Sequence, residues 1–505
     1  MMKEDWVETA LIDVCEVLDN LRKPINSSER KKRIEGKVES ELYPYYGATG
    51  QVGFIDDFLT DGDYVLIGED AAPFLDCTKN VAYKISGKTW VNNHAHILKS
   101  LLNNDFLLHF LNQFQYKNYV TGTTRLKLTQ GALKRMPVWV APLPIQRAIV
   151  SKIETLFSDL DKGIADLKKA QEQLKIYRQA VLKKAFEGEL TREWREQQTD
   201  LPTAEELLEQ IKKERQKHYE QQLEEWKQAV KDWEENGEER KRPGKPQQPK
   251  ETSYLNEEVR NLSRLPKSWE YVCPEQVASP EKYSIGIGPF GSNLKVSDYK
   301  DSGVPLIFVK NITRNDYSLN LKYISSEKFD ELFAHSVKPL DILITKMGDP
   351  PGDCSIYPEN SPLGIITSDC LKFRVWQKYA NRMYFKYCIE SVSIKEQLGL
   401  ITQGVAQKKI STSRFKTLLF PFAPLQEQHQ IVKEIESRLS VCDKVEQNIA
   451  EALEKSEALR QSILKKAFEG KLLSKAEIEA CRREADYEPA SALLERIRKE
   501  RPSGK

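Results

Sequence analysis

Apolar residues recur at seven-residue intervals along a stretch that follows Pro142. The repeating positions are Ile153, Leu160, Leu167, Leu174 and Val181, and Phe157, Ile164 and Ala185 occupy the complementary spacing. Such a heptad pattern predicts a long helix whose apolar seam is buried against a partner helix. From residue 146 to Phe186 the helix would be about 60 Å long at about 1.5 Å per residue.

The helical pattern occurs twice in the chain. The string Leu182-Lys183-Lys184-Ala185-Phe186-Glu187-Gly188 recurs as Leu464-Lys465-Lys466-Ala467-Phe468-Glu469-Gly470, an offset of 282 residues. The apolar positions of the second copy include Ile435, Leu439, Ile449, Leu453, Ile463 and Phe468. Because neither seam can be buried alone, we expect the two helices to pair as an antiparallel coiled coil.

Short apolar runs separated by Gly, Asn and Asp precede each helical copy. Residues 64–67, 136–140, 304–309 and 341–344 predict strands, and residues 105–114 predict a helix. The fold class is therefore α+β, with two mixed α/β domains separated by the coiled coil in a pseudo-twofold arrangement. The expected regions are 1–141, 142–264, 265–423 and 424–505.

A charged segment follows only the first helical copy. Thr203, with Glu205 and Glu206 after it, predicts the start of a helix that reaches about residue 233. Residues 236–252 are rich in Pro, Gly, Gln and charge, which is typical of a linker. The C-terminal copy has no equivalent of the stretch from about 216 to 262, and its role is not explained by the sequence.

Composition narrows the class of protein only slightly. The 505 residues carry a net charge of +2, so the total charge does not by itself indicate a nucleic-acid binder. There is no apolar run of the roughly 20 residues that a membrane span needs, and the N-terminus lacks the apolar core of a signal peptide. We therefore expect a cytoplasmic protein whose eight cysteines are reduced.

Several strings resemble the specificity subunit of type I restriction-modification systems, and the resemblance covers essentially the whole chain. Pro-Leu at 142–143 and 424–425, followed by Gln and Ile-Val, opens each helix, and Leu-Lys-Lys-Ala-Phe-Glu-Gly closes it. The strings at 62–70, 91–96 and 288–292 are also characteristic.

The resemblance implies a non-catalytic, sequence-specific DNA-recognition subunit. Each mixed domain is then a target-recognition domain for one half of a bipartite double-stranded DNA target, and the coiled coil sets the unread spacer. Two methyltransferase (modification) subunits would dock on the helical regions, and restriction/translocase subunits can join them. S-adenosylmethionine, ATP and Mg²⁺ would be bound by these partners and not by this chain.

Loops before the last strand of each domain are candidate DNA contacts, although an ordinary loop is an equally good interpretation. The first-domain candidates are Thr121, Gly122, Thr123, Thr124, Arg125 and Lys127. The second-domain candidates are Gln403, Gly404, Gln407, Lys408 and Lys409. Further candidates are Tyr45, Asn92, Asn93, Lys310, Asn311, Arg314 and Lys346, and of these Tyr45 also suits simple strand packing.

Three other motifs indicate less. His94 and His96 lack Cys or acidic residues at metal-ligand spacing, so they favour a structural or DNA-proximal role and no metal. Asp349-Pro350-Pro351-Gly352 lacks the aromatic residue of an adenine-methyltransferase motif and predicts a turn. Gly286-Ile287-Gly288-Pro289-Phe290-Gly291 has the letters of a dinucleotide fingerprint, but Pro289 stands where a helix should open, which favours a loop.

Two other classes of protein stay open. The chain could be a self-contained DNA methyltransferase or nuclease with a coiled-coil arm, although no phosphate-binding loop supports this. It could also be a two-headed coiled-coil adaptor between proteins, which the near-neutral charge permits. Only the family strings weigh strongly against the adaptor.

Overall fold

The computed structural model describes residues 5–76, 78–235, 242–249, 262–348, 351–402 and 409–500. The chain forms two compact units, each of which is described by itself. Unit 1 contains Met1–Ala170 and Gln447–Lys505, and unit 2 contains Gln171–Glu446. Each unit therefore has one mixed domain, called here a head, together with a part of each long helix.

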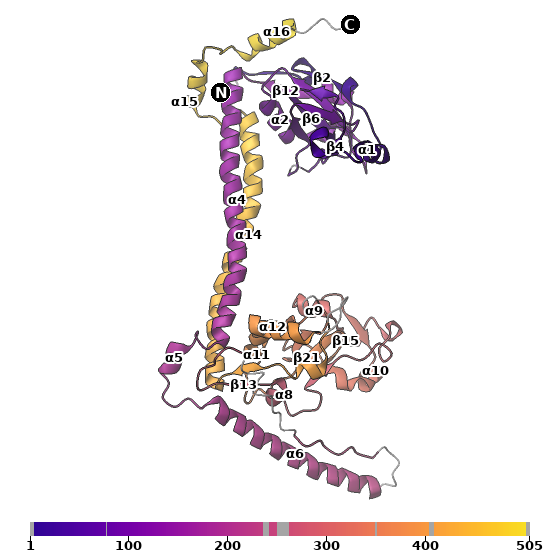
Figure 1. The fold of residues 1–505 in the computed structure, drawn as a ribbon, viewed down its shortest axis with the longest axis vertical. Helices are drawn as coiled ribbons and strands as arrows, with labels where there is room; N and C mark the ends of the chain where they lie inside the picture. Colours follow the sequence, from indigo (N-terminus) through magenta and orange to yellow (C-terminus); the bar gives the residue numbers. More distant parts are fainter. Residues whose placement is uncertain are drawn as a thin grey trace. The chain divides into compact units, whose positions relative to one another are not determined.

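The two long helices are α4 (Leu143–Phe186) and α14 (Leu425–Phe468), each of 44 residues. In each unit their segments lie side by side (Figure 1). Both end before a glycine in the left-handed region, Gly188 with φ of +74° and Gly470 with φ of +75°, which is the usual C-terminal cap of a helix. The heptad pattern thus predicted both helices with nearly correct ends.

The apolar seam of this helix pair is the one expected from the heptads. Ile153, Val181, Phe186, Ile435, Ile449, Ile463 and Phe468 are buried, and Leu160, Leu167, Leu174, Leu439 and Leu453 are half-buried. Most neighbouring positions between the seam residues are exposed. The burial pattern therefore confirms the coiled coil.

Two ion pairs show that the helices run antiparallel. In unit 2, Nη2 of Arg178 lies 2.7 Å from a carboxylate oxygen of Asp443. In unit 1, Arg460 pairs with Asp161. Each residue of the first pair lies 282 positions from its counterpart in the second pair, so the duplicated sequence makes the same contact twice.

The first head consists of two four-stranded sheets, a terminal strand pair and a short two-stranded hairpin. One sheet has the order β2-β9-β6-β7 and the other β4-β3-β8-β5, while β1 pairs with β12. The strands are β1 (Val7–Ala10), β2 (Cys15–Val17), β3 (Tyr43–Gly47), β4 (Gly50–Ile55), β5 (Thr60–Asp61), β6 (Tyr64–Gly68), β7 (Ala82–Ile85), β8 (Lys88–Val91), β9 (Ala95–Ser100) and β12 (Pro137–Val140). Its helices are α1 (Ser27–Ile34), α2 (Asn104–Gln113) and α3 (Gln130–Lys134).

The second head repeats the two sheets and the terminal pair strand for strand. Its sheets have the orders β14-β21-β18-β19 and β16-β15-β20-β17, and β13 pairs with β22. The strands are β13 (Glu270–Val272), β14 (Ile285–Ile287), β15 (Val304–Ile307), β16 (Lys322–Ile324), β17 (Ser336–Val337), β18 (Ile342–Thr345), β19 (Cys354–Ile356), β20 (Gly364–Ile366), β21 (Cys370–Phe373) and β22 (Phe420–Phe422). Its helices are α8 (Pro274–Val277), α9 (Val309–Thr313), α10 (Ser326–Glu331), α11 (Arg382–Glu390), α12 (Val392–Ile401) and α13 (Thr412–Phe415).

A buried glutamine near the start of each long helix joins that helix to its head. Gln146 accepts a hydrogen bond from the backbone N–H of Asn103 at 3.0 Å and donates to the carbonyl of Ala141 at 2.6 Å. Gln428 makes the same two bonds in unit 2, to Asn381 at 2.8 Å and to Ala423 at 2.7 Å. Since Asn103 and Asn381 cap α2 and α11, each glutamine fixes the head helix against the long helix.

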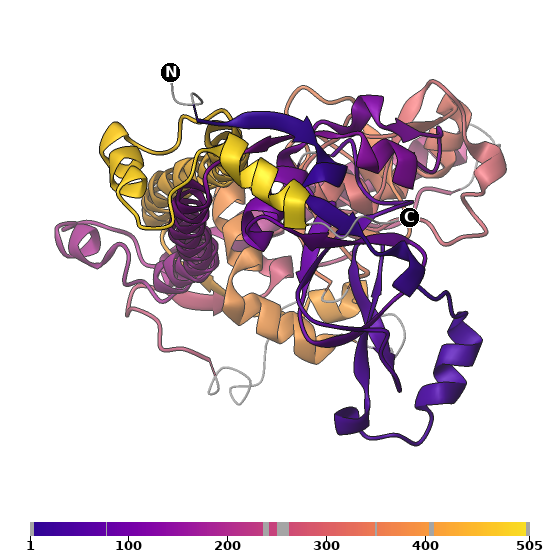
Figure 2. The ribbon, with the colours of Figure 1, turned by 90° about the horizontal axis from the view of Figure 1, so that it is seen from above.

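The segment that follows each long helix packs on a head. After α14, α15 (Lys475–Arg482) packs beside the start of α4, where Lys152 pairs with Glu477 at 3.0 Å. The next helix, α16 (Ala490–Glu500), lies on the first head, and the N–H of Ala490 donates to the carbonyl of Asp5 at 3.3 Å (Figure 2). After α4 come α5 (Arg192–Glu196) and α6 (Ala204–Glu235), and the N–H of Ala204 donates to the carbonyl of Ser268 at 2.8 Å. Each head is thus completed by residues from beyond a long helix.

A single buried carboxylate joins three segments of unit 2. Glu427, which is fully buried, accepts hydrogen bonds from Nε1 of Trp269 at 2.8 Å and from the hydroxyl of Thr191 at 2.7 Å. Arg195 lies 3.1 Å away and completes the set. Burial raises the pKa of Glu427, although these three donors oppose the shift. The carboxylate therefore ties the segment after α4 and the start of the second head to α14.

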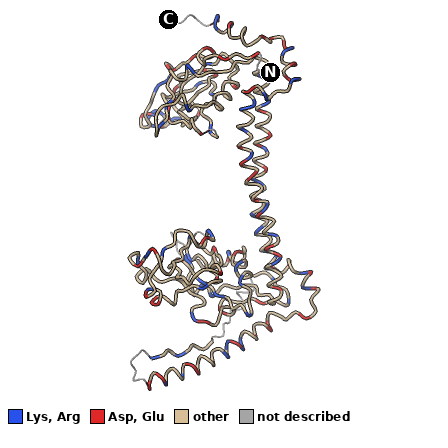
Figure 3. The backbone as a smooth tube through the Cα atoms, turned by 180° about the vertical axis from the view of Figure 1, so that it is seen from behind, with Lys and Arg blue, Asp and Glu red and all other residues tan. Residues whose placement is uncertain are grey.

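The charged stretch after residue 216 is the outer part of α6 with a return segment. Nε1 of Trp226 donates to the carbonyl of Pro243 at 3.0 Å, and Lys245 lies over the same indole at 5.8 Å. Arg242 lies over the ring of Trp233 at 5.8 Å. Basic and acidic residues are interspersed along α6 (Figure 3). The predicted linker is thus, in its described residues 242–249, an extended segment that packs on the helix.

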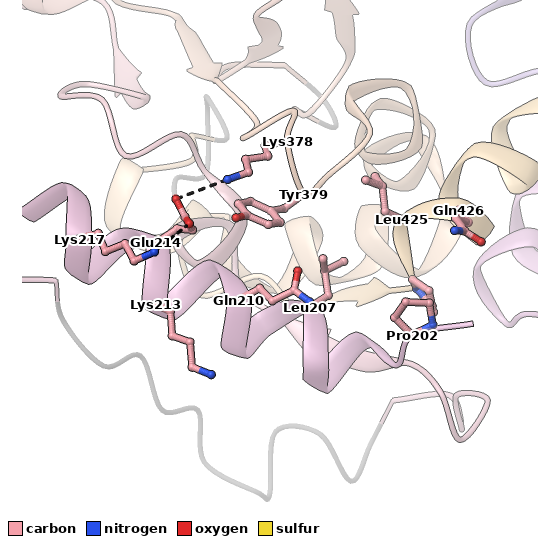
Figure 4. A pocket seen from close by; sticks show the side chains of 11 residues that line it. Pro202, Leu207, Gln210, Lys213, Glu214, Lys217, Lys378, Tyr379, Leu425 and Gln426 are labelled. Atoms are coloured by element: carbon pink, nitrogen blue, oxygen red, sulfur yellow. Dashed lines mark ion pairs between the residues drawn. The ribbon is translucent and has the colours of Figure 1, made fainter. Parts of the chain in front are cut away.

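A surface pocket of about 590 Å³ lies where α6 meets the start of α14. Leu207, Tyr379 and Leu425 supply apolar lining, and Glu214 forms an ion pair with Lys378 at 3.4 Å (Figure 4). The pocket contains none of the candidate DNA residues. Among the described residues, no helix combines the length and the apolar character that crossing a bilayer requires.

Candidate nucleic-acid interface

The first head presents an exposed hairpin made of β10 (Val120–Thr121) and β11 (Lys127–Leu128). The side chains from Thr121 to Arg125 are exposed at its tip. Gly122 has a φ of +100°, and a Cβ at this position would lie 2.4 Å from the carbonyl oxygen of Arg125. Only glycine permits this turn without strain. The hairpin that carries Thr123, Thr124 and Arg125 therefore depends on Gly122.

The hairpin is seated on the segment that follows β6. The backbone N–H of Leu128 donates to the carbonyl of Glu69 at 2.7 Å, and that of Ala71 donates to the carbonyl of Leu126 at 3.1 Å. Asp70 forms an isolated β-bridge with Lys127. The Gly-Glu-Asp end of the 62–70 string thus supports the loop that carries the candidate cations.

Two carboxylates organise the cations at this edge. Asp70 lies 3.0 Å from Nη2 of Arg125 and 2.9 Å from Nδ1 of His94. Glu69 lies 3.0 Å from Nζ of Lys127 and 2.5 Å from Nη1 of Arg22. Burial acts to raise the pKa of Glu69, but its bonds with Arg22 and Lys127 outweigh burial and lower the pKa overall. The edge therefore holds positioned donors and acceptors of the kind that base edges can match.

The two histidines have different surroundings. His94 is exposed at the edge, with 41% of its side chain accessible. His96 is buried, with Nδ1 2.7 Å from Asp19 and Nε2 2.9 Å from the carbonyl of Leu128. Burial acts to raise the pKa of Asp19. The hydrogen bonds that Asp19 accepts from His96 and Gln130, together with the nearby charge of Arg22, outweigh burial and lower this pKa overall. His96 is thus structural, whereas His94 lies near the hairpin.

The remaining first-head candidates differ in exposure. Asn93 is exposed, while Asn92 is mostly buried and its side chain accepts the N–H of His94 at 2.8 Å. Tyr45 is 4% exposed inside a small cluster with Ile55. Asn92 therefore shapes the loop, and the expectation that Tyr45 contacts DNA is wrong because its ring packs in the interior.

The second head has the same backbone contacts at the equivalent edge. Met347 forms an isolated bridge with Lys409, as Asp70 does with Lys127. The N–H of Ile410 donates to the carbonyl of Lys346 at 3.0 Å, as that of Leu128 donates to Glu69. Lys346 and Met347 thus stand where the first head has two carboxylates. The two heads share a frame and present different chemistry.

The other second-head candidates differ in whether the structure describes them and in how exposed they are. Gln403, Gly404, Gln407 and Lys408 lie outside the described residues, as do Asp349 and Pro350, while Lys409 is exposed. Arg314 is exposed at the end of α9, and Lys310 is half-buried over the ring of Phe308. Asn311 is fully buried, where it accepts the N–H of Phe308 at 2.9 Å and donates to the carbonyl of Asp316 at 3.0 Å. The expectation that Asn311 contacts DNA is therefore wrong.

The glycine string at 286–291 lies in a strand and the loop after it. Gly286 is in β14, and residues 288–295 form no helix. These described residues thus form the predicted loop and not the strand-turn-helix of a dinucleotide-binding site. Sequence reasoning missed Arg22, Glu69 and Asp70 as parts of the edge, although the string that ends in Gly-Glu-Asp after an apolar run was a usable signal.

Two heads of one topology, each with an exposed edge of different chemistry, define a duplicated recognition protein. The family model described as "Type I restriction modification DNA specificity domain" matches residues 3–169 and 295–455. These matches cover more than half of the chain and include most of each head. The chain belongs to this family of type I restriction-modification specificity subunits, which recognise DNA sequence.

Individual relatives agree with this family. The type I restriction enzyme EcoDI specificity subunit of Escherichia coli is 22% identical over 500 residues, which is 95% of each chain. The EcoBI specificity subunit of Escherichia coli is 27% identical over 76% of this chain and 69% of that one. A putative specificity subunit of Haemophilus influenzae is 34% identical over 148 residues, and that match spans only 36% of the relative's length.

Solved structures share the fold. A chain from a study of complex assembly and conformational transition of the type I R-M system has a TM-score of 0.56 at 15% identity, covering 92% of this chain and 98% of that one. The HsdS subunit from Thermoanaerobacter tengcongensis has a TM-score of 0.50 at 16% identity, covering 93% and 98%. At these identities the likeness is one of fold alone.

Proposed function

We propose that each head reads one half of a bipartite DNA target. The observation that carries this proposal is the equivalent edge of the two heads, where the same backbone bonds hold Glu69 and Asp70 in one head and Lys346 and Met347 in the other. A conserved frame with exchanged side chains suits two related modules with different base preferences. In this proposal the chain binds DNA in the cytoplasm.

The long helices then supply the spacer and the docking surface. Each helix has 44 residues, or about 65 Å at about 1.5 Å per residue, and this length would limit how far apart two half-sites can be. Away from the seam, the helices expose apolar side chains: Ile176, Tyr177, Val441, Val445 and Leu459. Exposed apolar side chains on a rigid helix are typical of a protein-binding surface. The proposed occupants are two methyltransferase subunits, with restriction/translocase subunits joining them.

The chain itself is proposed to be non-catalytic. The edge of the first head holds carboxylates paired with basic side chains, and each group positions its partner. Such fixed donors and acceptors suit the recognition of nucleobase edges. S-adenosylmethionine, ATP and Mg²⁺ are accordingly assigned to the partner subunits. A self-contained methyltransferase would instead methylate DNA without them.

Co-expression with the methyltransferase subunit tests the proposal. Sequencing that detects methylated adenines in the host genome should show one split motif with two specific halves. A swap of residues 5–141 for the first head of a related subunit should change one half and leave the other. Methylation by this chain alone, or a continuous motif that the swap alters throughout, would contradict the proposal.

A further inference from the structure

Phe290 of the second head is displayed to solvent by a fixed loop. Its side chain is 67% exposed, whereas Gly288 and Pro289 before it are buried. An apolar ring in water gains none of the stabilisation that burial would give it. The exposure of Phe290 beside the candidate interface is therefore not explained by the stability of the head.

The loop is anchored to the sheet at Gly288. The N–H of Gly288 donates to the carbonyl of Cys370 at 3.2 Å. A Cβ on Gly288 would lie 2.1 Å from the carbonyl carbon and oxygen of Thr367, so only glycine allows the loop to press against the segment between β20 and β21. Phe290 is thus held two residues beyond a backbone anchor.

The ring lies beside the edge that the two heads share. Nζ of Lys346 is 5.9 Å from the centroid of Phe290 and 3.3 Å from the carbonyl of Ser368. The carbonyl of the same lysine accepts the N–H of Ile410, next to the bridge between Met347 and Lys409. An exposed aromatic ring and two lysines therefore belong to one side of the second head.

The first head has polar groups in the equivalent place. The N–H of Leu18, which follows β2, donates to Ile97 at 2.8 Å, as Gly288 after β14 donates to Cys370. The chain then continues to Asp19 and to Arg22, which pairs with Glu69. One head thus places charged groups where the other places Phe290.

We propose that Phe290 packs directly on a base of the half-site read by the second head, with Lys346 on the adjacent phosphate. The inference rests on the proposed function. In duplex DNA an apolar ring packs on the thymine methyl group in the major groove or wedges between base steps, and lysine on a phosphate positions the protein without reading sequence. Phe290 therefore determines specificity, and Lys346 contributes affinity.

The experiment uses the complex with the methyltransferase subunit and a DNA duplex that carries the motif found in the methylated genome. Phe290→Ala should weaken binding roughly 5- to 150-fold, which is the range for losing one specific base-pair contact in a duplex. It should relax the preference at one or two neighbouring positions of a single half-site. The dependence of binding on salt should not change, because no charge is removed.

Three variants serve as controls. Phe290→Tyr keeps the ring and should restore most of the affinity. Val296→Ala removes another apolar side chain of the same head, 79% exposed, and should change nothing. Lys346→Ala should weaken binding to every sequence alike and lower the salt slope by about one.

The outcomes separate this inference from the proposed function. If Phe290→Ala keeps the affinity and the methylated motif of the wild type, the base contact is refuted while two-headed recognition stands. The same holds if the preference changes in both halves equally. If the wild-type complex shows no split motif, the proposed function fails first.

Discussion

Replacing Glu427 by alanine should destabilise unit 2 severely. The substitution leaves the indole N–H of Trp269 and the hydroxyl of Thr191 buried without an acceptor, and it removes the carboxylate beside Arg195. Each unsatisfied buried group costs about 1–3 kcal/mol, and breaking a buried pair costs about 3–5 kcal/mol. Because these costs overlap, we expect a total loss of about 4 kcal/mol in the free energy of unfolding.

Calorimetry of the purified chain measures this loss. A domain of this size loses about 2–4 °C of Tm per kcal/mol, so the transition of unit 2 should fall by roughly 8–16 °C. The transition of unit 1 should stay in place. Glu427→Gln keeps an oxygen acceptor and removes a charge whose pKa burial already raises, so it should cost about 1–2 kcal/mol.

Glu436→Ala is the matched control, because it removes an exposed glutamate from the same helix and should change stability by less than about 0.5 kcal/mol. A loss below about 1 kcal/mol for Glu427→Ala would refute the reasoning. It would mean that the three donors find water or other acceptors once the carboxylate is gone. An equal fall in both transitions would also contradict the assignment of this contact to unit 2.

Four further predictions concern the edge and the helices. Arg125→Ala and Lys409→Ala should each weaken DNA binding and lower its salt slope by about one in titrations from 50 to 200 mM salt, and unchanged slopes would remove both loops from the interface. Gly122→Ala should distort the hairpin and reduce DNA affinity without lowering Tm by more than a few degrees, and full affinity would show that the turn tolerates a Cβ. The folded-state pKa of Asp19 lies below the ordinary value of 3.8. Ionised Asp19 therefore stabilises the fold above about pH 4, and this stabilisation is lost as the pH falls through the lowered pKa. In acid unfolding at about pH 2–5, Asp19→Asn should remove this part of the pH dependence of stability. Tyr177→Asp should reduce co-purification of the methyltransferase subunit at unchanged Tm, and equal co-purification would exclude this side chain from docking.

The helices could be predicted from the sequence because their information is local. A seven-residue period and a 282-residue offset identify the seam, and Gly188 and Gly470 mark where the helices end. The topology of the heads could not be predicted in this way. Their sequences diverged while the strand order stayed the same, so the shared frame appears only in backbone bonds such as those of Leu128 and Ile410.

The candidate site could be predicted only in part, because residue types can be read locally but contacts between distant segments cannot. Arg125 could be chosen by its residue type, but its partner Asp70 lies 55 positions earlier, and no local pattern connects them. Residue type also misled: Tyr45 and Asn311 have groups suited to DNA, yet tertiary packing buries both. Exposure, which decides whether a donor can reach a ligand, is set by contacts between distant segments.

The division of the chain into its two units has a consequence for synthesis. Unit 2 is continuous from Gln171 to Glu446, whereas unit 1 combines the segment before it with the segment after it. The core of the first head includes Leu493, Leu494 and Ile497 of α16, which are synthesised after all of unit 2. The first head is therefore completed only after unit 2 has been synthesised. Until then, the apolar surface that α14 and α16 cover stays open on a nascent chain, and a premature stop before α16 damages the first head.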